Sequence, residues 1–296
     1  MNNTLLKQAG ILIALFFLVS LNAWSEETFK PFVLVSSEAT DFNGAVDTTK
    51  NKLQSGGFTI AGEYAPSEGA HVLVVPSHAL QAAAAKSEFG GYGSVIRVSV
   101  TQNGDKIEVA YSNPLYWGKA FRLAEDLTAV ANKMESAMGK GEPFGSKDGL
   151  KAKKLMKYHY KIMMPYFDDP HTLASFDSYA DAMAKINEGL AAGKGGVSKV
   201  FEVKIPGKDE SLIGVAITEG DGADKNIMDK IDVHGTRHTA HLPYAMLVSG
   251  NKAYTLSGKF RIALSFPDLS MMGKGSFMEI MDAPSGIENS LSSVAK

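Results

Sequence analysis

The stretch Tyr92-Gly-Ser-Val-Ile-Arg-Val-Ser-Val100, the turn Asn103-Gly-Asp105 and the stretch Ile107-Glu-Val-Ala-Tyr-Ser-Asn-Pro114 together decide the fold. Two apolar runs on either side of Asn-Gly form a strong signal for a β-hairpin. A similar arrangement follows in the second half, where Tyr244-Ala-Met-Leu-Val248 precedes Phe260-Arg-Ile-Ala-Leu-Ser-Phe-Pro267. The first tyrosines lie 152 positions apart and the final prolines 153. This spacing predicts two similar domains in tandem, since solenoid repeats are only about 20–50 residues long.

The rest of the pattern predicts an α+β fold in which each domain has an antiparallel sheet with helices packed on it. Asp41 is expected to cap the first helix, and a long amphipathic helix is expected over Tyr116–Met138. In the second half we expect a strand around Tyr160–Tyr166, a hairpin of 242–248 with 254–266, and a last helix from about Ser276.

The N-terminus has the features of a secretory signal peptide: Lys7, the apolar run Ile11–Val19 and the small residues of Ala23-Trp-Ser25. The run is shorter than the roughly 20 residues that span a bilayer, so we expect cleavage and no stable membrane anchor. The expected location is the periplasm or the exterior. The predicted divisions are a signal peptide (1–25), a first domain (26–138), a linker (139–158) and a second domain (159–296).

The composition excludes several classes of function. The chain has no cysteine, which excludes disulfides, cysteine nucleophiles and thiolate metal sites. The formal charge of −2 gives no general attraction for nucleic acid. The sequence also lacks Gly-x-Ser-x-Gly, a phosphate-binding loop and His-Glu-x-x-His. An enzyme is therefore less favoured than a binding protein.

A histidine cluster is the clearest candidate for a metal or haem site. His234, His238 and His241 lie within eight residues, and Asp232 precedes them. Three imidazoles with a carboxylate would suit zinc, copper or iron. Against this, the spacing matches no established metal motif, and the fixed charge of Arg237 repels a cation. Exposed loop histidines are the alternative interpretation.

Methionine is concentrated in the second half, with ten of thirteen residues after position 150. Thioethers suit Cu(I), but methionine is also an adaptable core residue. Met278 and Met281 have helical spacing beside Ile280, so core packing is the favoured interpretation.

Aromatic and amide side chains gather around the first hairpin and the Asn-Pro junction that ends it. Tyr92, Asn113, Tyr116 and Trp117 could line a pocket for an apolar ligand. They could equally fill the space between a sheet and a helix. The residues leave both alternatives open.

The segments His71-Val-Leu-Val-Val-Pro-Ser-His-Ala-Leu80, Gly91–Val100 and Ile107–Pro114 resemble the bacterial domain-of-unknown-function family 302. The resemblance covers roughly residues 30–138 and, more faintly, 159–294. It implies a compact α+β sandwich that often pairs into dimers, so a duplicated chain would form a pseudo-dimer. It implies no activity. We therefore expect an exported, non-enzymatic binding or accessory protein whose partner is a small ligand or a periplasmic protein; the alternative is a metal- or haem-handling protein using the histidine cluster.

Overall fold

The computed structural model describes residues 27–159 and 164–296, and the predicted signal peptide lies outside this range. The α+β class is confirmed, because helices pack on antiparallel sheets in both halves. The first half contains, in chain order, β2 (Phe32–Glu38), α1 (Phe42–Ser55), β3 (Gly62–Ser67), β4 (Ala70–Pro76), α2 (His78–Ala85), β5 (Val95–Asn103), β6 (Lys106–Ser112), α3 (Pro114–Ala120) and α4 (Thr128–Met138).

The second half has the same order of element types. It contains β9 (His171–Ser175), α6 (Tyr179–Ala191), β10 (Val197–Lys204), β11 (Glu210–Ile217), α7 (Asp224–Ile231), β12 (Tyr244–Ser249), β13 (Lys252–Thr255), α8 (Gly258–Ser265) and α9 (Ala283–Val294). The strand orders also correspond: the first sheet is β3-β4-β5-β6-β2, with β7 (Glu142–Phe144) added at its edge, and the second is β10-β11-β12-β13-β9.

Several local expectations hold. Asp41 caps α1 by accepting a hydrogen bond from the Gly44 amide at 2.6 Å. The first hairpin turns at Gly104, whose φ of 66° suits glycine, and Asn103 pairs with Lys106 across it.

Two local predictions are wrong. The predicted helix 116–138 is two helices, α3 and α4, separated at Arg122, where φ is +51°. The predicted strand over 254–266 ends at Thr255, and α8 follows it. The residues of α8 from Phe260 to Ser265 are all buried, so the helix has no polar face to produce a helical sequence pattern.

The remaining differences concern the second half and the predicted linker. Residues 164–166 form no strand, 160–163 lie outside the described residues, and β9 is the first strand. The last helix begins at Ala283 with Pro284 in its first turn, where proline is tolerated. The predicted linker contains β7, which pairs with β2, and a two-residue strand β8 (Leu150–Lys151), which pairs with β1 (Thr28–Phe29).

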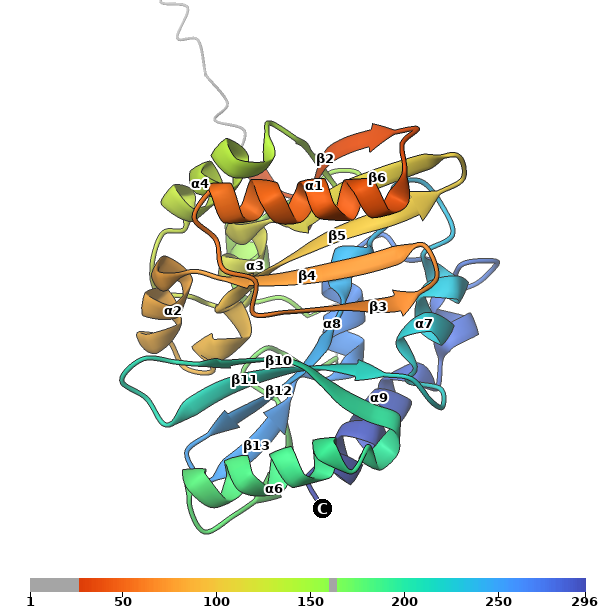
Figure 1. Cartoon of the computed structure of the whole chain (residues 1–296). Coiled ribbons are helices and arrows are strands. Elements are labelled where there is room, and N and C mark those ends of the chain that lie inside the picture. Colours follow the sequence, from red (N-terminus) through yellow and green to blue (C-terminus); the bar gives the residue numbers. More distant parts are fainter. Residues whose placement is uncertain (1–26, 160–163) are drawn as a thin grey trace, which may run out of the picture.

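The molecule is built of four layers (Figure 1), with α1 and α6 on the outer sides of the two sheets. Alternate residues of each strand point to opposite faces. One face of the first sheet packs on α1 and α4, and one face of the second packs on α6 and α9. The other faces share an inter-sheet core, which includes Val72, Val74, Trp117 and Phe121 from the first half and Phe201, Leu212, Leu247 and Leu264 from the second.

Hydrogen bonds fix the two halves against each other from both sides. The short helix η1 (Gly90–Gly93) contacts β11 and β12, and the Gly91 amide donates to Glu210 Oε1 at 2.9 Å. In return, η3 (Thr239–His241) contacts β5 and β6, and the nearby Arg237 amide donates to Glu108 Oε2 at 2.8 Å. Gly91 permits the close approach, since a Cβ there would lie 2.5 Å from Leu247 Cδ1.

Candidate functional site

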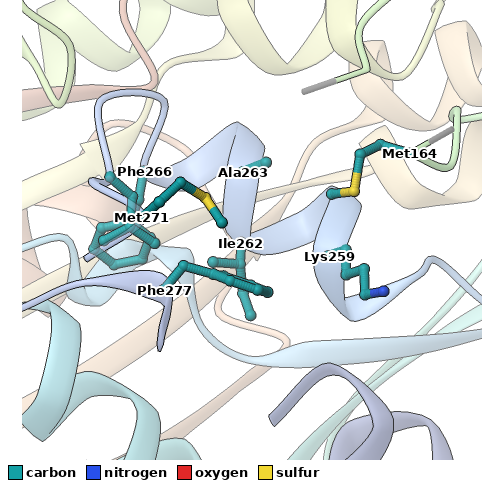
Figure 2. A pocket seen from close by; sticks show the side chains of 8 residues that line it. Met164, Lys259, Ile262, Ala263, Phe266, Met271 and Phe277 are labelled. Carbon is teal, nitrogen blue, oxygen red and sulfur yellow. The ribbon is translucent and has the colours of Figure 1, made fainter. Parts of the chain in front are cut away.

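An apolar pocket lies beside α8 in the second half (Figure 2). Its volume is about 130 Å³. Figure 2 shows Phe266 and Met271 on one side of Ile262, Met164 and Lys259 on the other, and the ring of Phe277 in line with Ile262 between them. Ala263 and Leu269 complete the lining. Lys259 supplies the one charged side chain of this set, so the pocket suits an uncharged, apolar group.

One wall of the pocket belongs to a segment that we call the methionine loop, residues 267–276. The loop is held at its base: the amides of Phe277 and Met278 donate to the carbonyls of Ser270 and Met271 at 2.9 and 3.3 Å. Its methionines are exposed, Met271 by 39% and Met272 by 79%. Burying such side chains against a ligand is favourable, because apolar surface leaves water.

The prediction that the methionines near the C-terminus pack in the core is therefore wrong for this region. Met278 and Met281, which follow the loop, are 52% and 53% exposed. Exposed methionines beside an open apolar pocket are typical of adaptable binding surfaces. The sequence carried a signal for this: the pair Met271-Met272 stands in a short, glycine-containing segment, where no regular element could bury both.

A larger groove lies on the other side of Phe266 and Leu269 and has a volume of about 510 Å³. It is formed by both halves of the chain, from Pro143–Lys147 in the first to His234, His238 and the methionine loop in the second. Lys30, Lys147 and Lys274 line it, with Asp268 as the acid. Asp268 accepts a hydrogen bond from the Lys147 amide at 2.6 Å. The lining thus carries an excess of positive charge.

The structure brings His238, which lines this groove, into contact with Asp232. The Nδ1 atom of His238 lies 3.1 Å from Asp232 Oδ1, and the His238 amide donates to both carboxylate oxygens. The imidazole stacks on Phe266 with ring centroids 4.6 Å apart. These contacts orient the ring, while His234 lines the groove separately.

His241 is not available as a ligand. Its side chain is fully buried, with Nδ1 2.6 Å from Ser265 Oγ and Nε2 2.9 Å from the Tyr244 hydroxyl. Burial, and then the charges of Arg261 and Arg97, hold the pKa of this imidazole well below its usual value, so it is neutral at pH 7. In the described part of the chain, no group of three or more His, Asp or Glu residues is placed to hold a metal ion. The predicted three-histidine site is not formed.

The four predicted pocket residues lie in or beside the inter-sheet core. Tyr116 donates to the Leu264 carbonyl at 2.8 Å, and Trp117 Nε1 donates to the Pro31 carbonyl at 2.9 Å. Asn113 caps α3 by accepting from the Leu115 amide, and the buried ring of Tyr92 contacts Phe121. In this structure these side chains fill the space between sheet and helix, and they do not line the pocket or the groove.

Comparison with known proteins gives no family, because no family model, curated protein or solved structure matches the chain. The resemblance to family 302 stays a prediction that rests on the motifs quoted above. Within the residues that the structure describes, no helix is both long enough and apolar enough to span a bilayer.

Proposed function

We propose that this protein is an exported, non-enzymatic binding or accessory protein that holds an apolar group of its partner in the pocket beside α8. The observation that carries the proposal is the coincidence of an open apolar pocket with exposed methionines. Methionine adapts its shape to different ligands because its side chain is unbranched and polarisable. The signal-peptide pattern supports export.

The size of the pocket limits what enters it. Its volume of about 130 Å³ is close to that of engineered cavities of about 150 Å³ that bind benzene. The pocket therefore suits a single ring or branched apolar side chain and is too small for a long acyl chain. Burying one such side chain contributes about 1.5–3 kcal/mol, which alone gives binding weaker than millimolar. Stronger binding needs further contacts, and the methionine loop is the nearest surface for them.

A partner protein segment with a protruding Phe or Leu fits these limits best. The side chain would enter between Ile262 and Phe277, and the segment would rest on Met271 and Met272. Such an anchor in a pocket is how many protein interfaces obtain most of their affinity.

We propose also that the chain arose by duplication of one α+β unit and is a pseudo-dimer. The support is the common order of element types and the corresponding strand orders of the two sheets. Reciprocal contacts of η1 and η3 with the opposite sheet are what a two-fold arrangement would produce.

The binding proposal is tested by NMR of protein labelled with ¹³C at methionine methyl groups. N-acetyl-phenylalaninamide, N-acetyl-leucinamide and N-acetyl-alaninamide are titrated separately. The first two are expected to shift the Met164 and Met271 signals saturably, while alaninamide does not, because it fills too little of the pocket. Met134, fully buried in the first half, is the internal reference.

Two neighbouring variants provide the matched control. Met271→Lys places a charge in the pocket lining and is expected to weaken binding at least fivefold. Met272→Lys makes the same change one residue later, at a side chain outside the lining. It is expected to leave binding of these small amides within twofold, because they reach only the pocket and not the surface at Met272. Equal loss in both variants, or equal shifts at Met134 and Met164, would refute a specific pocket.

A further inference from the structure

Two of the four arginines of the chain are buried between the sheets, one from each half. Arg97 lies on β5 and Arg261 on α8, and each side chain is only 4% exposed. On β5 the neighbours Ile96 and Val98 belong to the core under the helices, so Arg97 faces the second half. Arginine is almost never fully buried unless it is paired.

Arg261 has a partial set of partners. Its Nη2 atom donates to the His241 carbonyl at 2.6 Å, and its guanidinium lies 4.9 Å from the centre of the Trp117 ring. Its Nη1 atom is buried and has no hydrogen-bond partner among the described residues.

Arg97 also has one buried donor without a partner among the described residues, its Nε atom. Its backbone amide uses the Ser112 hydroxyl. Burial and then the charge of Arg261 hold the pKa of Arg97 well below its usual value. The two arginines lie in the same region, because the His241 carbonyl that Arg261 binds belongs to η3, and η3 contacts β5, the strand of Arg97.

Within the described ranges, no carboxylate forms an ion pair with Arg97 or Arg261. Two buried acids at the contact between the halves bind other donors. Glu210 accepts from the Gly91 amide and the Ser249 hydroxyl. Asp224 accepts from the Tyr64 hydroxyl and the Ile217 amide. Unpaired buried charges are costly, because they lose their hydration without compensation.

We propose that a small monovalent anion of the size of chloride binds between Arg97 and Arg261. The free donors at Arg97 Nε and Arg261 Nη1 are the groups that would hold it. Neither arginine lines the pocket or the groove described above, and both are almost fully buried, so a small ion suits this place better than a large ligand. The anion would contact both halves of the chain and is independent of the binding function proposed for α8.

The test compares thermal unfolding in sodium gluconate with unfolding in mixtures of gluconate and chloride, bromide or sulfate at constant ionic strength. A ligand at 100 times its Kd is expected to raise Tm by about 4–6 °C in a protein of this size. Chloride and bromide are expected to give this saturable rise, and sulfate a smaller one. A Tm that is equal in chloride and gluconate at every concentration would overturn the proposal.

Arg97→Met is expected to abolish the chloride-dependent rise and to unfold in gluconate at a temperature no lower than the wild type, because a buried charge is replaced by an apolar side chain. The control is Arg122→Met, since Arg122 is partly exposed and paired with Asp168 at 2.6 Å; it should keep the full rise.

If Arg97→Met does not fold, crystals of the wild type grown in bromide decide the question. An anomalous peak within about 3.5 Å of both guanidinium groups is expected for N–H donors that hold an anion. Bromide found only at the surface, an adventitious ion only, contradicts the proposal.

Discussion

Asp224 provides a direct test of how the two halves are joined. Its buried carboxylate accepts a hydrogen bond from the hydroxyl of Tyr64, on the opposite half, at 2.9 Å, and its Oδ1 atom has no partner among the described residues. Burial raises the pKa of Asp224 to about 7, against the lowering by its hydrogen bonds to Tyr64 and Ile217. The group is therefore protonated in the folded protein at pH 5 and ionised in the unfolded chain.

The sign of the pH effect follows from proton binding. Between about pH 4 and pH 7 the folded state holds one more proton than the unfolded state at this site, so the free energy of unfolding falls as the pH rises. Each pH unit accounts for about 1.4 kcal/mol. From pH 5 to pH 8 this amounts to a loss of about 3 kcal/mol, most of it below pH 7, and the change from this group ends at about pH 8.

Asp224→Asn removes the titration and keeps the shape of the side chain, and its oxygen still accepts from Tyr64. The expected result is that the variant gains about 3 kcal/mol relative to the wild type between pH 5 and pH 8. Urea denaturation of both proteins at the two pH values measures this, and the comparison cancels the titration of every other group.

Asp229→Asn is the matched control, because Asp229 lies on the same helix α7 with a side chain 55% exposed. Its difference from the wild type is expected to be the same at both pH values. If Asp224→Asn also gives a difference that does not change with pH, the assignment of a protonated, buried Asp224 is refuted.

Three further predictions concern the contact between the two halves and the N-terminus. Because the folded-state pKa of His241 is lowered, this site by itself reduces the stability of the wild type below about pH 6.5, and His241→Asn removes that contribution. The deficit of His241→Asn in the free energy of unfolding, relative to the wild type, should therefore shrink by about 1.4 kcal/mol between pH 7.5 and 5.5 in urea titrations, and a constant deficit would contradict this. Gly91→Ala should destabilise by about 1–3 kcal/mol, since its Cβ would overlap Leu247, and chemical denaturation that shows a change within 0.5 kcal/mol would exclude so close a contact. N-terminal sequencing of protein from a periplasmic extract should begin at Glu26, and an N-terminal Met1 would show that the signal is not cleaved.

The sequence was sufficient for the parts of the fold that local chemistry determines. The hairpin at Gly104 and the cap at Asp41 depend on neighbouring residues alone, and both are confirmed. The sequence was not sufficient for α8, where Phe260, Ile262 and Leu264 alternate with other residues as in a strand. The residues from Phe260 to Ser265 are all buried in the tertiary structure, and a short buried apolar segment does not show from its sequence whether it is a helix or a strand.

The candidate site was predicted less well, for a related reason. His241 resembles its neighbour His238 in sequence, yet one is buried against Ser265 and Tyr244 and the other lies at a groove. Exposure of Met271 likewise depends on how the methionine loop folds back on Ser270. Residue types predicted the possible chemistry, but only packing decides which atoms a ligand reaches.

The shared core between the sheets has a consequence for synthesis. When the first half has left the ribosome, Val72, Val74 and Trp117 have no covering layer, because Phe201 and Leu247 have not yet been synthesised. At about 5–20 residues per second, the rest of the chain needs roughly 7–30 s to follow. Throughout that interval a neighbouring chain at the same stage presents a similar bare surface. Until its own second half is made, the exposed surface of one unfinished chain can therefore associate with that of another. Slower elongation lengthens this interval and so lowers the concentration of unfinished chains at which such association becomes significant.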